Sequence, residues 1–355
     1  MVHAALPPEG HPELNAPSLR GRRVLVTGAS GFIGSHIAER LLAQGAAVRL
    51  LVRHPDHVAA MAASGAAIHE GDLTIPASLR GCCDGIDVVF HSAAWIGTPY
   101  IRAAAWGANV DGTRAVMAEA RRSGVRRFIH LSSVAVYGPV RTGVVTENLP
   151  LGGAIEPYGE SKIAAEAAAH DAAGDDVEVV ITRPGMVYGP RSRAWTVRLV
   201  RWITEGRPAM VAGGHGYARP IFIENLLDAL VLCATVPAAG QQTFTLIDGN
   251  VRWRDYLRYY ARMVGRRPRS VSYPVSWLIA LTDELRARVT RRPPRIRRAA
   301  LGYAVSHAVF STEKARGLLG WQPRYAMPEA MALTHAWLIA NGYLPQRSPT
   351  ATDSS

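Results

Sequence analysis

Short apolar runs rich in β-branched residues alternate with longer stretches of helical pattern along the first half of the chain. The runs begin at Arg23 and read RVLVTG, AAVRLLV, AAIHEGD, IDVVFHS, RRFIHLSS and VEVVITRP. Nearly all of their residues are apolar, as expected of strands that are covered on both faces. The helical patterns between them cover Ile33–Gln44, Arg102–Ser123 and Tyr158–Ala173. This alternation predicts an α/β fold built on a doubly wound parallel sheet.

The pattern loosens after about Tyr188. Residues 191–223 and 251–343 are richer in Trp, Tyr, Arg and Pro, and we expect them to be mainly helical. Between them TFTLID, at 243–248, is predicted to return to the sheet as a late strand. The C-terminal part should therefore form a smaller, mainly helical lobe over the carboxyl ends of the strands, where open α/β sheets bind their ligands.

These patterns divide the chain into four predicted segments. Solvated tails are expected at 1–20 and 346–355. A doubly wound domain is expected over 21–190, and a substrate-binding lobe over 191–345. At 355 residues the chain can bury a large core, and its composition is that of a soluble globular protein.

The three cysteines form neither a disulfide framework nor a metal-binding pattern, although Cys82 and Cys83 are adjacent. No metal is therefore predicted, and a reducing cytoplasm is the expected compartment. The N-terminal residues contain no apolar core of signal-peptide length, and no window reaches the roughly 18 apolar residues of a spanning helix.

The net charge of +12 is concentrated in one region. Ten arginines lie between Arg266 and Arg298, against Asp283 and Glu284 only. Aromatic residues that could stack on bases are sparse there, so no nucleic-acid partner is expected. Within 272–298 an apolar segment precedes the densest arginines. We interpret this segment as a lid helix with a solvated basic flank, and the alternative is peripheral contact with an anionic membrane surface.

Three glycines follow the first predicted strand directly and open the first predicted helix, at Gly28, Gly31 and Gly34. Glycines at such a turn let backbone amides approach a pyrophosphate at the positive end of the helix. Because the turn belongs to the first strand–helix unit of an α/β alternation, it predicts a dinucleotide site in a Rossmann-like fold.

The spacing G-x-x-G-x-x-G resembles that of the extended short-chain dehydrogenase/reductase family, also called the NAD-dependent epimerase/dehydratase family. The segments EGDL, FHSAAW, NVDGT, LSSVAVYG, YGESK and RPGMVYGP continue the resemblance in order to about Pro190. The resemblance implies an NAD(P)-binding Rossmann domain over 21–190. The cofactor contacts that it implies are Gly28, Ser30, Gly31, Phe32, Ile33, Gly34, Asp72, Leu73, Ala93, Ala94, Asn109, Tyr158, Lys162 and Pro184.

Lys162 is one of only two lysines among the 40 basic residues. It stands four residues after Tyr158, so the two side chains share a helix face. A phenol titrates near pH ~10, and an adjacent ammonium group, together with oxidised nicotinamide, would lower that pKa. The resemblance implies that the lysine also hydrogen-bonds the nicotinamide ribose, and the broad, rigid guanidinium of an arginine could not fit between ribose and phenol. We therefore expect Tyr158 to transfer the proton and Lys162 to assist it.

The resemblance assigns the catalytic serine to Ser133, by alignment on Val-Tyr-Gly, with Ser132 as its neighbour. Its hydroxyl would hold the substrate oxygen against Tyr158 while hydride transfer takes place at nicotinamide C4. Asn109 is expected to support this site or simply to position its helix. Cofactor choice depends on Arg53, because NAD-selective relatives carry an acid where the second strand ends and this chain has Val52 followed by arginine. We therefore favour NADP(H), with NAD as the alternative.

Departures from the family's subfamilies narrow the expected reaction. The sugar-nucleotide dehydratases carry Asp and Glu where this chain has Val134 and Ala135, which cannot exchange protons. Nucleotide-sugar epimerases carry Asn where this chain has Met186. Arg219 survives from their pattern and could meet an anion. Apolar substrate contacts are expected from residues that include Trp95 and Met186, with Trp195 and Trp202 as further candidates for the same pocket.

The C-terminal pattern resembles the 3β-hydroxysteroid dehydrogenase and dihydroflavonol reductase branch. This implies interconversion of a secondary alcohol and a ketone on a hydrophobic, steroid-, terpenoid- or flavonoid-like substrate. The alternatives are a nucleotide-sugar epimerase and a non-catalytic NAD(P)-binding regulator. Regulators of this family typically lose the tyrosine or the lysine, whereas Ser133, Tyr158 and Lys162 are all present here. A homodimer is expected by analogy with relatives alone.

Overall fold

The computed structural model of the chain describes residues 18–96, 101–152, 157–290, 294 and 297–346. Most of the two predicted tails lies outside the described residues.

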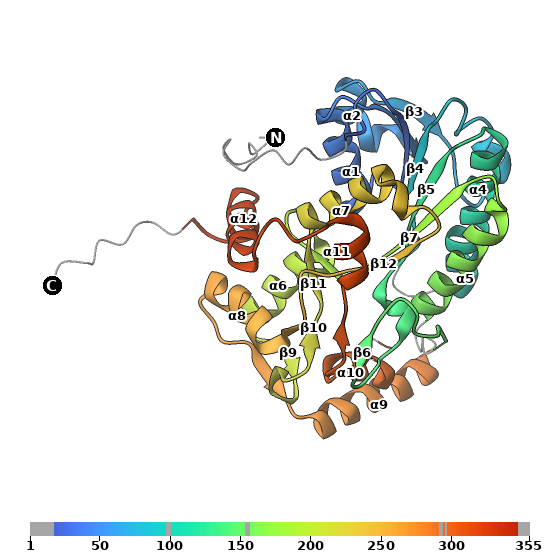
Figure 1. Ribbon diagram of the computed structural model, residues 1–355. Helices are drawn as coiled ribbons and strands as arrows, with labels where there is room; N and C mark the ends of the chain where they lie inside the picture. The colour runs from blue at the N-terminus through green and yellow to red at the C-terminus, as the bar shows by residue number, and fades with distance from the viewer. Residues whose placement is uncertain (1–17, 97–100, 153–156, 291–293, 295–296, 347–355) are drawn as a thin grey trace.

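Among the described residues, seven parallel strands form a central sheet (Figure 1). In sheet order they are β12 (Thr243–Leu246), β7 (Glu178–Pro184), β5 (Arg127–Leu131), β4 (Val88–His91), β1 (Arg23–Thr27), β2 (Ala47–Val52) and β3 (Ala67–Glu70). Each of the seven apolar runs supplies one strand, which confirms the predicted doubly wound sheet. The order of connection reverses between β1 and β4, and ligands of such sheets bind at this switch point.

Helices cover both faces of the sheet, which is why the strands contain so few polar residues. On one face α1 (Phe32–Ala43) packs beside α7 (Ile223–Thr235). On the other face α4 (Gly112–Arg122) packs beside α5 (Pro157–Ala173) (Figure 1). The single helix expected over 102–123 is interrupted: α3 (Arg102–Trp106) leads into the π-helical turn η3 (Gly107–Asp111), and α4 follows. Such π turns occur frequently at functional sites.

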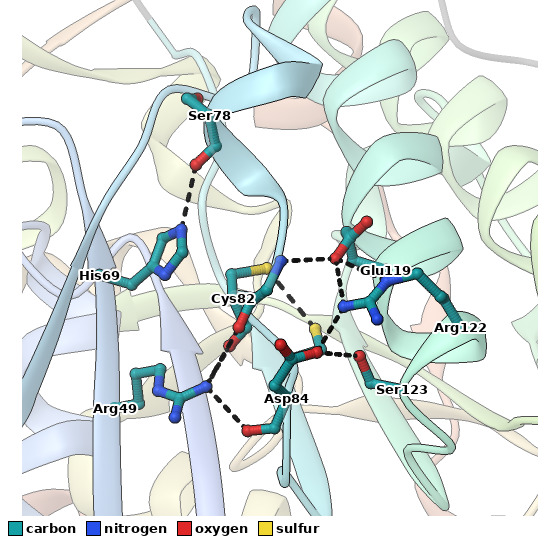
Figure 2. A network of polar contacts seen from close by, with 10 residues as sticks. Arg49, His69, Ser78, Cys82, Asp84, Glu119, Arg122 and Ser123 are labelled. Atoms are coloured by element: carbon teal, nitrogen blue, oxygen red, sulfur yellow. Dashed lines mark hydrogen bonds and ion pairs between the residues drawn. The ribbon is translucent and has the colours of Figure 1, made fainter.

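A polar network fastens the loop before β4 to strand β2 and to helix α4 (Figure 2). Arg49 of β2 donates from Nη1 to the carbonyl oxygens of Cys82 at 2.9 Å and Asp84 at 3.0 Å. Glu119 of α4 accepts a backbone N–H of the same loop at 2.8 Å. Within the loop the Sγ atoms of Cys82 and Cys83 lie 3.6 Å apart, and the cysteines are buried free thiols.

Outside the central sheet, the described residues form small two-stranded ladders that the periodicity of the sequence did not predict. The ladders pair β8 with β11, β9 with β14, β10 with β13 and β6 with β15. The strands of these ladders are β6 (Val144–Val145), β8 (Met186–Tyr188), β9 (Pro208–Val211), β10 (Tyr217–Ala218), β11 (Pro220–Phe222), β13 (Val251–Arg252), β14 (Arg269–Val271) and β15 (Val309–Phe310). The remaining helices are α2 (Ala59–Ala63), α6 (Arg198–Thr204), α8 (Trp253–Val264), α9 (Tyr273–Thr290), α10 (Leu301–Ala304), α11 (Glu313–Leu319) and α12 (Met327–Ala340).

Candidate active site

The glycine turn between β1 and α1 packs so closely on the end of β4 that side chains are excluded. A Cβ atom on Gly28, whose φ is +70°, would lie 2.8 Å from the backbone N and Cα of Ala93. A Cβ atom on Gly34 would lie 2.2 Å from the Gly28 carbonyl oxygen. No side chain caps α1 at Gly31, and its first turn contains no acidic residue. The N–H groups of this turn therefore suit an anionic pyrophosphate, and the turn fits the predicted dinucleotide.

The ends of β2 and β3 bring Arg53 and Asp72 together beside this turn. Strand β2 ends at the buried Val52, and the exposed Arg53 follows it. Arg53 Nη1 lies 4.0 Å from Asp72 Oδ2. The backbone N–H and the hydroxyl of Thr74 both donate to Asp72 Oδ1 at 2.8 Å, and these bonds lower the pKa of Asp72, with a smaller contribution from Arg53. Leu73 packs against the first residue of α4.

Asn109 connects the segment after β4 to the helix that carries Tyr158. It lies buried in the π-helical turn, and its Oδ1 accepts the backbone N–H of Trp95 at 2.6 Å. Its Nδ2 donates to Ser161 Oγ at 3.0 Å. Ser161 Oγ donates in turn to the carbonyl oxygen of Tyr158 at 2.8 Å. These contacts suit the supporting role that was predicted for Asn109.

His91, the last residue of β4, also helps to hold the segment that follows this strand. Its ring nitrogens lie 2.9 Å from Thr27 Oγ1 and 2.9 Å from Thr113 Oγ1. Burial lowers the pKa of His91 to about 3, with a smaller effect from Lys162, so the imidazole is neutral at physiological pH. Thr27 Oγ1 also accepts the backbone N–H of Ala93 at 3.2 Å. The predicted cofactor contacts at Ala93 and Ala94 therefore directly follow a strand end that these side chains hold.

The two adjacent serines after β5 have different surroundings. Ser132 is buried, and its hydroxyl donates to the carboxylate of Glu166. Ser133 is half-buried and begins the 3-10 helix η4 (Val134–Tyr137), where its Oγ accepts the backbone N–H of Ala135 at 3.2 Å. The hydroxyl hydrogen of Ser133 can therefore still be donated to a ligand.

Lys162 lies one turn beyond Tyr158 on α5, which packs against η4. The lysine is 3% exposed, and its Nζ donates to the carbonyl oxygen of Leu131 at 2.6 Å. Burial lowers its pKa to about 8, and the negative charge of Glu166 opposes this effect. The structure thus brings the lysine to the strand end that carries Ser133, with Tyr158 half-buried on the preceding turn.

A buried ion pair next to Lys162 and Ser132 was not predicted from the sequence. Glu166 accepts from Arg183 Nε at 3.0 Å and from Arg183 Nη2 at 2.6 Å. Arg183 Nη1 donates to Tyr137 Oη at 2.9 Å. This pair ties α5 to β7 and to η4. One signal was available, because Glu166 stands one helical turn beyond Lys162 and so shares its face.

The predicted substrate residues are spread over the strand ends and the lobe. Pro184 is buried at the end of β7, and Met186 is half-buried on β8. Arg219 is buried, its Nη2 donates to Ser306 Oγ at 2.6 Å and to a carbonyl oxygen at 2.9 Å, and burial lowers its pKa to about 10. The Arg219 guanidinium is thus held by the lobe itself. Trp195 and Trp202 both lie against the Arg198 guanidinium, at 5.7 Å and 5.5 Å.

Among the described residues, no group of three or more His, Cys, Asp or Glu side chains is arranged to hold a metal ion. Within the same part of the chain, no helix is long and apolar enough to cross a membrane.

Comparison with known proteins identifies the family of the chain. Residues 24–246 match the profile of the NAD dependent epimerase/dehydratase family. The chain belongs to this family. The predicted resemblance is therefore confirmed, and the protein is an enzyme of the extended short-chain dehydrogenase/reductase type with an NAD-binding Rossmann fold.

Two relatives and one solved structure illustrate the range of the family. The 4-hydroxy-2-methyl-3-oxo-4-farnesyl-3,4-dihydroquinoline-1-oxide ketoreductase of Stigmatella aurantiaca is 28% identical over 92% of this chain and 100% of its own length. The 3 beta-hydroxysteroid dehydrogenase/Delta 5→4-isomerase of Mycobacterium tuberculosis is 28% identical over 87% of this chain and 88% of its own. The structure of MoeE5 in complex with UDP-glucose and NAD matches with a TM-score of 0.69 at 26% identity, over 90% of this chain and 99% of the other.

Proposed function

We propose that this enzyme interconverts a secondary alcohol and a ketone on an apolar, ring-containing substrate. One observation carries the proposal: Val134 and Ala135, which cannot exchange protons, follow Ser133 at the strand end that also receives Lys162. Elimination of water needs an acid and a base, which the sugar-nucleotide dehydratases that the chain resembles carry at those two positions, whereas oxidation of an alcohol needs one proton transfer beside the hydride transfer. The printed names of the two relatives, a ketoreductase and a hydroxysteroid dehydrogenase, support this reaction and an apolar substrate.

Three residues have roles in the proposed mechanism. Tyr158, as the phenolate, accepts the proton of the substrate hydroxyl group during oxidation of the alcohol and returns it during reduction of the ketone. Ser133 donates its hydroxyl hydrogen to the substrate oxygen, because its Oγ already accepts a backbone N–H. Lys162 has three N–H donors and uses one of them on the Leu131 carbonyl oxygen. The other two remain for the ribose and for the phenolate, whose charge the ammonium group stabilises.

Bound nicotinamide supplies the hydride donor or acceptor for this reaction. The backbone of the turn at Gly28, Gly31 and Gly34 would hold the pyrophosphate of the dinucleotide at the start of α1. We propose that the enzyme prefers NADP(H), because the exposed Arg53 at the end of β2 suits a 2′-phosphate. The apolar Val52, buried at that strand end, provides no acceptor for a free ribose hydroxyl group.

The test follows the absorbance of reduced nicotinamide in purified protein with NADP+ or NAD+ and pooled hydroxysteroids and other apolar secondary alcohols. A sustained rise is expected with NADP+. Tyr158→Phe should lower the rate by a factor of about 10²–10⁴, while Tyr343→Phe, at an exposed tyrosine, should leave it unchanged. Full turnover by Tyr158→Phe would refute the proposed proton transfer.

A nucleotide-sugar epimerase is the second candidate, because the solved structure of MoeE5 contains UDP-glucose and NAD. An epimerase reduces and reoxidises its cofactor within one cycle, so its absorbance shows no net change. Nucleotide sugars should therefore be incubated in parallel and their products analysed for inversion. An inverted sugar without any turnover of apolar alcohols would establish the epimerase and refute the assignment based on Met186.

A further inference from the structure

The long helix α9 (Tyr273–Thr290) turns an apolar face to solvent. Leu278 is 56% exposed and Val289 is 85% exposed, and three other large apolar side chains of this helix are exposed as well. The exposed set is Val275, Leu278, Ile279, Leu285 and Val289. Spacings of three, four and seven residues relate its members, so they form one stripe along the helix.

The opposite face of α9, which packs on the lobe, carries the small and acidic residues. Ser276 and Ala280 are the buried residues of the helix. Asp283 pairs with Arg286 at 2.9 Å, and Glu284 pairs with Arg298 at 2.9 Å. A surface helix of a globular protein buries its apolar stripe and exposes its charges. The distribution along α9 is the reverse, and the exposed stripe is a candidate for contact with an apolar phase.

The sequence in and next to α9 carries an excess of positive charge. Arg288 is exposed on α9 itself, and the region from Arg266 to Arg298 contains ten arginines and only two acidic residues. Both acidic side chains are engaged in the ion pairs on the inner side of the helix. Trp277 is exposed beside the stripe, and the Arg298 guanidinium lies over its ring at 5.2 Å. Tryptophan and arginine together are typical of the boundary between lipid headgroups and acyl chains.

The position of α9 leaves the stripe accessible. The helix lies along the lower rim of the molecule, with α10 beside it (Figure 1). Its 18 residues give it a length of about 27 Å. Among the described residues no helix can cross a membrane, so contact of α9 with lipid would be parallel to the membrane plane.

We infer that the α9 face is a docking surface for an anionic phospholipid bilayer. The stripe enters the boundary between headgroups and acyl chains, and exposed arginines such as Arg288 bind the lipid phosphates. Complementary charge selects anionic lipid, and the apolar stripe provides the burial that a purely electrostatic contact lacks. The inference requires no particular substrate and stands independently of the proposed function.

Co-sedimentation of the full chain with vesicles tests this inference. One set of vesicles contains phosphatidylcholine alone, and the other contains phosphatidylcholine with phosphatidylserine. We expect binding to the anionic vesicles that weakens as salt is added. The double variant Leu278→Gln, Leu285→Gln should bind at least about tenfold more weakly. Its matched control is Val309→Gln, Leu318→Gln, which removes two apolar side chains exposed to a similar degree elsewhere and should bind like the wild type.

Three outcomes would overturn the inference: no binding of the wild type to either kind of vesicle, equal binding by the α9 variant, or equal loss in the control. Sedimentation velocity identifies the competing occupant. A dimer that the α9 substitutions dissociate, without any vesicle binding, would assign this face to a second copy of the chain. If the double variant fails to fold, the single exposed changes Val289→Gln and Arg288→Gln provide the same comparison.

Discussion

Replacement of Lys162 by methionine should stabilise the cofactor-free protein. Burial lowers the pKa of this lysine from 10.5 to about 8. At pH 7 that difference corresponds to a destabilisation of about 3 kcal/mol by the charged side chain. Methionine has a similar length and no charge, but it gives up the hydrogen bond to the Leu131 carbonyl oxygen, worth about 1 kcal/mol. The net gain in the free energy of unfolding is therefore about 2 kcal/mol.

The gain should depend on pH. Below about pH 8 the lysine is charged in both the folded and the unfolded chain, so the folded protein bears the full destabilisation. As the pH rises from about 8 toward 10.5, the folded lysine loses its proton first and the destabilisation fades. At pH 10 about 1 kcal/mol of it remains, which the lost hydrogen bond cancels. Urea unfolding of both proteins at pH 7 and pH 10 measures the difference.

Lys162→Arg is the control for this experiment, because a guanidinium keeps its charge throughout the pH range. It should be less stable than the wild type at pH 7 and should not recover at pH 10. A methionine variant that gains no stability at pH 7, or gains as much at pH 10, would refute the assignment of the destabilisation to a buried charge. The methionine variant should also lose catalytic activity, because the buried lysine lowers stability but is needed for the proposed reaction.

Two further changes test the cofactor site. Gly34→Ala should abolish cofactor binding and lower stability, because the new Cβ would lie 2.2 Å from a backbone oxygen. The control Gly317→Ala meets nothing within 4 Å and should gain up to about 1 kcal/mol of stability in its helix. Fluorescence titration with NADPH and thermal unfolding measure both variants, and a Gly34→Ala variant that binds NADPH normally would contradict the turn geometry. Arg53→Ala should raise the Kd for NADPH about tenfold or more and leave that for NADH within about twofold, and an equal effect on both cofactors would exclude Arg53 as the selectivity residue.

The sheet and the covering helices could be predicted from the sequence because their signals are local. Each strand is a run of apolar residues, and α5 is one uninterrupted helix in which the spacing of four places Tyr158 and Lys162 on the same face. The π-helical turn at Gly107–Asp111 could not be predicted, because one extra residue in a turn barely changes the periodicity. The ladder of β8 with β11 escaped detection for a related reason, since strands of three residues are too short to show alternation.

Prediction from the sequence was least complete around the candidate catalytic residues. The spacing of Tyr158 and Lys162 can be read directly from the sequence, whereas the burial of the lysine depends on packing between segments far apart in the chain. The pair of Glu166 with Arg183 joins a helix to a strand in the same way, and although Glu166 shares a helix face with Lys162, nothing in its segment points to Arg183 as its partner. Which of the two serines is engaged by Glu166 likewise became clear only from the fold.

The buried thiols also make the protein its own reporter of unfolding. All three cysteines of the chain, Cys82, Cys83 and Cys233, are inaccessible in the folded state. Burial raises the pKa of Cys233, and the thiol of Cys83 is held protonated by its hydrogen bond to Cys82 and by burial. Alkylating reagents act on exposed thiolates, so the folded enzyme should be inert to them. The rate at which label is incorporated therefore measures how often the core opens, without any engineered probe.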